Sequence, residues 1–133
     1  MKTNNQTIKI VGRVTSGNAL GHLLGFPTAN LKPTVELAQV ADGVWAAWVS
    51  VEGRDYMAVV NIGRSPSVVE NGERRVEAHL VDFEGDIYNQ EITLRLLFHL
   101  REERKFPSRE ALVEQIARDK QEAIALLTDA KNI

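Results

Sequence analysis

A glycine-rich stretch near the N-terminus ends in two polar residues whose chemistry suits phosphate and a metal ion. The stretch GNALGHLLGFPTANL starts at Gly17, contains His22 and ends with Thr28 and Asn30 close together. Glycines let backbone N–H groups approach an anion closely. Thr28 and Asn30 alternate along an extended segment, so their side-chain oxygens point to the same side. A hydroxyl and an amide oxygen are hard ligands that Mg²⁺ accepts beside phosphate oxygens and water.

The glycine spacing by itself does not identify a nucleotide site. The pattern G-x-x-x-G-x-x-x-G matches neither the Walker A motif nor the dinucleotide fingerprint. A surface loop whose glycines serve turns is the better explanation of the glycines taken alone. The residues that favour a phosphate and metal site are those of FPTAN, because Pro27 restricts the backbone beside Thr28 and Asn30.

Glu77 is the candidate general base, in the segment RRVEAHLV. Strand alternation places Glu77 on one face with Arg75 and His79, and the apolar residues between them on the other. A carboxylate that is ionised at neutral pH can accept the proton of a substrate hydroxyl if the geometry brings them together. A polar face exposed to solvent is the simpler interpretation of this segment taken alone.

The segment HLREERKF combines cations with an aromatic ring at the end of the last apolar run. Arg101 and Arg104 lie close to Phe106 in the sequence. A guanidinium and an aromatic ring can stack on a planar ligand and bind its polar edge. A charged connection between a strand and a helix is the alternative.

The candidates lie on or beside short runs that are rich in β-branched residues. Gly, Pro, Asn and Asp separate these runs. They predict an antiparallel barrel or sandwich, because turns rather than helices separate the runs. The turn VEGRD predicts a hairpin between its flanking runs, and DFEGD, residues 82–86, predicts a second turn of this kind. The expected strands are Ile8–Val14, Thr28–Leu31, Val44–Val51, Met57–Ile62, Arg75–Val81 and Glu91–Leu100.

From Pro107 onward the apolar period changes to that of a helix. Ser108 is a candidate N-cap and Glu110 falls in the first turn, where the helix dipole favours a negative charge. About five helical turns should pack one apolar stripe on the sheet. The stripe consists of Leu112, Val113, Ile116, Ala123, Ile124 and Leu127.

Composition narrows the function classes. The chain has 133 residues, which predicts a single domain over 1–133, and its net charge is −2. This balance argues against a general binder of nucleic acid or anionic membranes, which needs a basic face. There is no cysteine, no N-terminal apolar segment of a signal peptide and no long apolar run. We therefore expect a cytoplasmic protein that does not bind membranes or nucleic acid.

The same segments, in the same order, resemble the riboflavin kinase (flavokinase) family, in particular the kinase module of bacterial bifunctional FAD synthetases. The resemblance extends from about Gly12 to Leu127. It rests on five segments, GRVTSGNALGHLLGFPTANL, DGVWAAWV, NIGRSPS, VEAHLVDFEGDIY and LREERKF, of which PTAN within the first is the most specific.

The resemblance implies a six-stranded antiparallel Greek-key barrel with a C-terminal helix. It also implies transfer of the γ-phosphoryl of ATP to the 5′-hydroxyl of riboflavin, giving FMN and ADP. We separately expect a monomer. Carried over by position, Thr28 and Asn30 would bind Mg²⁺, and they would bind the nucleotide together with Gly17 and His22. Glu77 would be the catalytic base, and the flavin-binding residues would be Arg101, Arg104 and Phe106.

Three residues depart from the family pattern. His22 replaces the usual Arg or Lys and is only partly charged at neutral pH. Ser67 replaces a Thr but keeps the hydroxyl, and Asn89 stands where Gly is common and tolerates a left-handed backbone. A non-catalytic flavin- or nucleotide-binding module on the same barrel therefore stays an alternative, as does an interaction barrel that binds no flavin.

Overall fold

The computed structural model describes residues 8–17, 29–33, 40–63, 74–83 and 85–131. The predicted metal ligand Thr28 and the predicted nucleotide-binding residue His22 lie outside these ranges. The described elements are the strands β1 (Ile8–Gly17), β2 (Ala29–Pro33), β3 (Gly43–Val51), β4 (Arg54–Gly63), β5 (Arg75–Leu80) and β6 (Glu91–Arg101), and the helix α2 (Arg109–Lys131).

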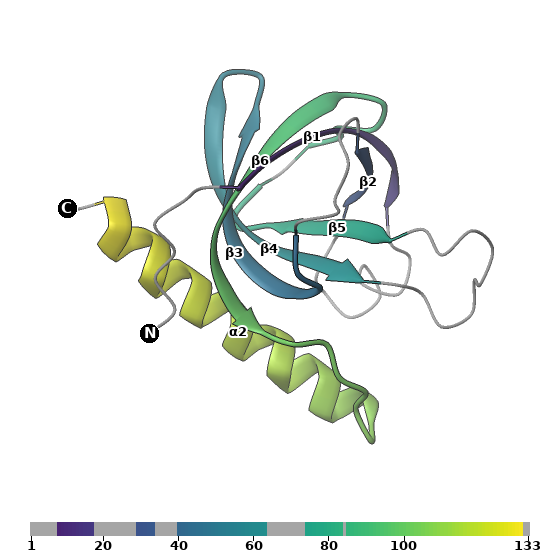
Figure 1. The fold of residues 1–133 in the computed structure, drawn as a ribbon, viewed down its shortest axis with the longest axis vertical. Coiled ribbons are helices and arrows are strands. Elements are labelled where there is room, and N and C mark those ends of the chain that lie inside the picture. The colour runs from purple at the N-terminus through teal and green to yellow at the C-terminus, as the bar shows by residue number, and fades with distance from the viewer. Residues whose placement is uncertain (1–7, 18–28, 34–39, 64–73, 84, 132–133) are drawn as a thin grey trace.

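The six described strands form a closed antiparallel barrel in the order β1-β2-β5-β4-β3-β6 (Figure 1). The strands β3, β4 and β5 are consecutive neighbours, and β6 returns to pair with β3. This is a Greek-key arrangement. The prediction of a six-stranded antiparallel barrel followed by a C-terminal helix is therefore confirmed.

Strand alternation produces two apolar clusters, one inside the barrel and one outside it. The inner cluster includes Ile10, Leu31, Val60, Val76 and Leu94. The outer cluster lies between the barrel and α2, which contacts β3, β4 and β6. Its buried members are Val44, Ala46, Phe98, Leu100, Ala123 and Leu127. The barrel thus encloses one core and presents a second apolar surface to the helix.

The predicted hairpin between β3 and β4 is present: β3 ends at Val51 as predicted, and β4 begins at Arg54, three residues before the predicted start. Val51 pairs with Arg54, leaving Glu52 and Gly53 as a two-residue turn. Both have positive φ, 49° and 82°, as a type I′ turn requires. This turn matches the twist of the strands, which fixes the register of β3 against β4.

The second predicted turn does not join neighbouring strands. Asp82 has a φ of 54° and lies at a turn, as the DFEGD motif predicts. However, β5 pairs with β2 and β4, while β6 pairs with β1 and β3. The connection therefore crosses from one part of the barrel to another, because the Greek-key order separates these two consecutive strands.

Helix α2 begins as predicted but continues further and packs unevenly. The hydroxyl of Ser108 accepts a hydrogen bond from the Ala111 N–H at 3.1 Å, which confirms the N-cap. In the C-terminal half, Ala123 and Leu127 are fully buried. In the N-terminal half the predicted apolar residues are only half-buried, and the buried side chain is that of Asp119. No helix within the described ranges is long and apolar enough to span a membrane.

Candidate active site

One row of directly paired positions runs round the barrel and joins three of the predicted site residues. Asn30 in β2 pairs with Glu77 in β5, and Glu77 pairs with Asn61 in β4. Asn61 pairs with Val44 in β3, which pairs with Arg101 in β6. Directly opposed residues point to the same face, with Cβ atoms about 4.5–5.5 Å apart between neighbours. The outer surface of the barrel thus carries Asn30 and Glu77 side by side. The register of β6 shifts between Val44 and Trp45, and Arg101 lies on the outer side because its guanidinium contacts Asp119 of α2.

Glu77 and Asn30 are direct cross-strand neighbours in this row. The side chain of Glu77 is 19% exposed, and Arg75 lies 3.7 Å from its carboxylate. The side-chain oxygen of Asn30 is shielded from solvent. An amide oxygen beside a carboxylate is a hard donor set of the kind that Mg²⁺ accepts. The described residues therefore fit the predicted metal and base positions.

Gly17 ends β1 at the same level of the barrel. It pairs with Ala29, the residue before Asn30, and a register shift separates Val14 from Ser16 in the same strand. Such bulges bend a strand and redirect the residues that follow. The predicted phosphate-binding loop thus starts directly beside the Asn30–Glu77 pair.

Asn61 is a polar member of the row that the sequence analysis did not single out. Asn61 falls within the predicted strand Met57–Ile62, and the observed strand β4 extends to Gly63. Ile62 is fully buried in the inner cluster, so Asn61 points outward beside Glu77. The alternation of buried residues along β4 is the signal that predicts its direction.

His79 lies in a different environment from a solvated polar face. His79 is 8% exposed, and it pairs with Val59, which packs against the outer apolar cluster. The predicted alternation along β5 is confirmed, because its apolar residues Val76, Ala78 and Leu80 all belong to the inner cluster. His79 is therefore a buried residue of the barrel wall.

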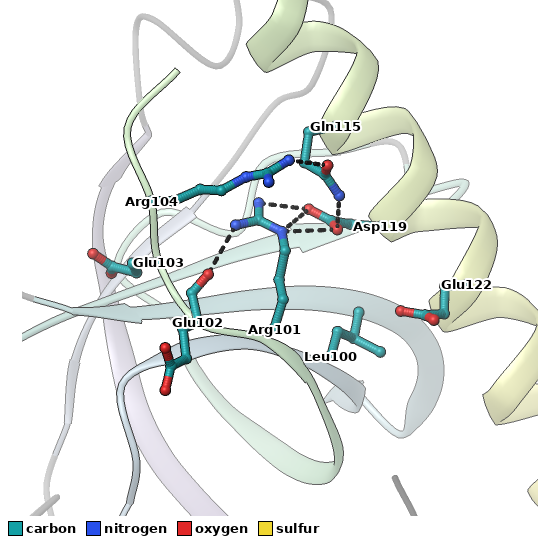
Figure 2. A pocket seen from close by; sticks show the side chains of 8 residues that line it. All are labelled: Leu100, Arg101, Glu102, Glu103, Arg104, Gln115, Asp119 and Glu122. Carbon is teal, nitrogen blue, oxygen red and sulfur yellow. Dashed lines mark hydrogen bonds and ion pairs between the residues drawn. The ribbon is translucent and has the colours of Figure 1, made fainter. Parts of the chain in front are cut away.

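Arg101 is fixed to α2 by a buried carboxylate. Its guanidinium donates hydrogen bonds to both oxygens of Asp119 at 2.8–3.1 Å and to the Glu102 carbonyl at 3.1 Å. The Asp119 side chain is only 5% exposed. Figure 2 shows the two groups facing each other between the end of β6 and the helix. Such a two-oxygen contact orients a guanidinium strongly.

Gln115 extends this contact to Arg104. Its amide nitrogen donates to Asp119 at 2.9 Å, and its amide oxygen accepts from Arg104 at 2.6 Å. The guanidinium carbons of Arg104 and Arg101 lie 4.9 and 5.6 Å from the centre of the Phe106 ring. The structure therefore brings the three predicted flavin-binding residues together and adds Gln115 and Asp119.

Asp119 could have been found in the sequence. It follows Ile116 by three residues and precedes Ala123 by four, so it lies on the predicted apolar stripe of the helix. A carboxylate on such a stripe is rarely buried without a partner. The position therefore indicates a buried ion pair, although the sequence does not show that Arg101 is its partner.

Two cavities flank the segment that follows β6. The larger, of about 510 Å³, lies among residues 100–104 and three helix residues, Gln115, Asp119 and Glu122 (Figure 2). The second, of about 270 Å³, lies against residues 104–107 and the first turns of α2. Arg104 and Gln115 line both. These cavities are of a size to take part of a planar ligand beside Phe106.

Glu103 is the one acidic residue with a clearly altered affinity for protons among the described residues of this region. Burial raises the pKa of Glu103 above its ordinary value of 4.5. The carboxylates of Asp42 and Glu77 raise this pKa further, while Arg101 lowers it. Glu103 is therefore electrostatically linked both to the row that contains Glu77 and to the cluster around Arg101.

The sequence that forms this barrel matches a known family. The family model described as Flavokinase: Riboflavin kinase matches residues 4–127. The chain therefore belongs to the riboflavin kinase family, whose members use ATP as co-substrate.

Individual relatives agree with this assignment. The RNA-binding riboflavin kinase RibR of Bacillus subtilis (strain 168) is 41% identical over 110 residues, which cover 83% of this chain and 47% of the relative. The bifunctional riboflavin kinase/FMN adenylyltransferase of Pseudomonas fluorescens is 39% identical over 118 residues, covering 89% and 38%. The chain thus spans less than half the length of these curated relatives.

Solved structures show the same fold. A riboflavin kinase from Trypanosoma brucei matches with a TM-score of 0.67 at 25% identity, covering 92% of this chain and 81% of that chain. A chain described as a macrolide-efflux protein from Streptococcus pneumoniae matches with a TM-score of 0.78 at 34% identity, covering 86% and 38%.

Proposed function

We propose that this chain is an active riboflavin kinase, which transfers the γ-phosphoryl of ATP to the 5′-hydroxyl of riboflavin and releases FMN and ADP. The observation that carries the proposal is the row of paired positions. In this row Glu77, the proposed base, lies directly beside Asn30, the proposed metal ligand, and the same row of pairs ends at Arg101. Family membership supplies the substrates.

Glu77 acts as the general base. Its carboxylate accepts the proton of the 5′-hydroxyl while that oxygen bonds to the γ-phosphorus and the bond to the bridging oxygen of ADP breaks. Pairing of β5 with both β2 and β4 holds the backbone of Glu77. Phosphoryl transfer depends mainly on alignment and charge stabilisation, so a fixed base is well suited to it.

Asn30 and Thr28 are the proposed protein ligands of Mg²⁺. The shielded amide oxygen of Asn30 fits this role, and Thr28 precedes it by two residues in the sequence. When bound, the ion would neutralise charge on the phosphate oxygens. Gly17 and His22 are proposed to contribute to nucleotide binding from the loop that starts after β1.

The ring of riboflavin is proposed to lie beside Phe106 and Arg104. Arg104 is exposed and held at one nitrogen by Gln115. Arg101 is engaged with Asp119 and lies over Phe106, so it contributes by fixing the position of the aromatic ring. The cavities on either side of residue 104 supply the space.

The direct test is production of FMN. We expect purified full-length chain, incubated with riboflavin and Mg-ATP, to yield FMN and ADP that chromatography separates from the substrates. An Asn30→Ala variant should need a higher Mg²⁺ concentration for half-maximal rate, because it lacks one ligand oxygen. Riboflavin binding without FMN formation would instead support the non-catalytic module, and absence of flavin binding would support an interaction barrel.

The remaining expectations concern the whole chain. We propose a cytoplasmic monomer with a single domain over 1–133 that binds neither membranes nor nucleic acid. The net charge of −2 supports the last point. Because the name of the Bacillus subtilis relative includes RNA binding, a gel-shift titration with RNA is the appropriate check, together with light scattering for the mass in solution.

A further inference from the structure

The carboxyl group of Glu103 lies directly against Gly63. A Cβ atom built on Gly63 would collide with this carboxyl group, and its three nearest heavy atoms all belong to Glu103. Gly63 is not among the residues with positive φ. A side chain at this position would therefore displace the Glu103 carboxyl group, which lies at the end of a flexible side chain, without straining the backbone.

This contact lies on the side of the segment after β6 that faces Glu77. Figure 2 shows Glu103 pointing away from Asp119 and Gln115, whereas Arg101 points toward them. Gly63 is two residues beyond Asn61, the cross-strand partner of Glu77, and it pairs with Arg75. Glu103 therefore lies one layer along the barrel from Glu77. The raised pKa of Glu103, caused in part by Glu77 and Asp42, agrees with this placement.

Glu103 lies between the two ends of the proposed site. It lines the larger cavity together with Arg101 and Arg104, and it interacts with Glu77. A flavin whose ring lies beside Phe106 and whose 5′-hydroxyl reaches Glu77 has to extend its ribityl chain past Glu103. The ribityl chain carries hydroxyl groups, which can donate hydrogen bonds, and an ionised carboxylate can only accept them.

We propose that Glu103, whose carboxyl group lies against Gly63, binds the hydroxyl groups of the ribityl chain and makes the site selective for flavins that carry a polyol. This inference rests on the proposed kinase function. A hydroxyl that donates to the carboxylate replaces water at a charged group, and hydrogen bonds to charged groups are among the stronger ones. Glu103 thus acts in substrate binding and leaves proton transfer to Glu77.

A comparison of two flavins tests the role. Riboflavin and lumiflavin share the ring system, but lumiflavin has a methyl group in place of the ribityl chain. In fluorescence titrations, Glu103→Ala should weaken riboflavin binding by about tenfold or more and leave lumiflavin binding within about twofold. Glu91→Gln, which removes an exposed carboxylate at the start of β6, should change neither. Steady-state rates should show the same loss as a higher riboflavin KM.

Gly63→Ala supplies an independent test. The added methyl group should displace the Glu103 carboxyl without straining the backbone, so circular dichroism should show a folded protein with weakened riboflavin binding. Adding Gly63→Ala to Glu103→Ala should cause no further loss, because the displaced group is already absent.

The outcomes separate the two proposals. Equal loss for both flavins, no loss for either, or additive losses in the double variant would overturn the role of Glu103 while leaving the kinase proposal intact. A wild-type chain that forms no FMN would refute the kinase proposal and, with it, the ribityl-binding role.

Discussion

The two sides of the proposed site are held in place by different forces. Glu77 belongs to a strand whose backbone is paired on both sides, with β2 and β4. The segment after β6 is not part of a strand and is held by side chains, through Asp119 and Gln115 of α2. That helix is anchored in turn by Ala123 and Leu127 in the outer apolar cluster.

This difference predicts which changes each side tolerates. Strand pairing depends on backbone groups, so a side-chain substitution at Glu77 removes chemistry but leaves the position of its neighbours unchanged. The flavin side depends on a few polar contacts, so one substitution can move Arg101, Arg104 and Phe106 together. The proposed base is thus fixed by the fold, whereas the proposed ring-binding segment can be adjusted by mutation.

The largest effect should come from removing the proposed base. Glu77→Gln keeps the size of the side chain and should lower kcat by about 10²- to 10⁴-fold, with riboflavin affinity and unfolding midpoint nearly unchanged. Initial rates of FMN formation and urea unfolding measure both. Full turnover by this variant would remove Glu77 from the mechanism.

Loss of the helix anchor should affect stability more than the site. Leu127→Ala removes a fully buried side chain and should lower the free energy of unfolding by about 2–5 kcal/mol. Molecules that remain folded keep the Arg101–Asp119 contact, so the riboflavin KM should change little. Asp129→Ala, at an exposed position of the same helix, is the matched control. A large rise in KM with Leu127→Ala would show that the apolar anchor also positions the flavin side.

Breaking the polar contact should affect both properties. Asp119→Ala leaves Arg101 without its carboxylate partner and should lower the free energy of unfolding by about 2–3 kcal/mol, since the Arg101 side chain is partly exposed. It should also raise the riboflavin KM, because the Arg101–Phe106 arrangement loses its support. An unchanged KM in this variant would mean that the segment is positioned by something other than α2.

The smallest effect concerns the pH dependence of stability. The folded state raises the pKa of Glu103, so it binds the proton more tightly than the unfolded chain. This carboxyl therefore costs stability as the pH rises through its pKa, and the cost is absent well below 4.5. Glu103→Gln should be more stable than the wild type at pH 7 by less than about 1 kcal/mol. The gain should vanish at low pH in urea titrations, and a constant gain would contradict the electrostatic cause.

Local features of the fold could be predicted from the sequence, whereas the pairing of distant strands could not. The Glu52–Gly53 turn, the Ser108 cap and the left-handed Asn89, with a φ of 64°, all depend on neighbouring residues. The position of β6 beside β3 depends on long-range packing, so the DFEGD turn was wrongly expected to join neighbouring strands.

The candidate site shows the same limit. Residue types and the resemblance indicate Glu77 and Asn30, but only the barrel register makes them neighbours. The contact between Glu103 and Gly63 joins two segments forty positions apart and has no local signal in the sequence.

Closure of the barrel also constrains how the chain is made. Ile8 at the start of β1 pairs with Leu96 in β6, and Arg13 pairs with Glu91. A ribosome releases β1 long before β6, so β1 lacks one of its partners during most of synthesis. Contacts this distant in sequence form slowly, and an unpaired strand edge is open to other chains in the meantime. The period before β6 completes the barrel is therefore the stage of biosynthesis most exposed to misassembly.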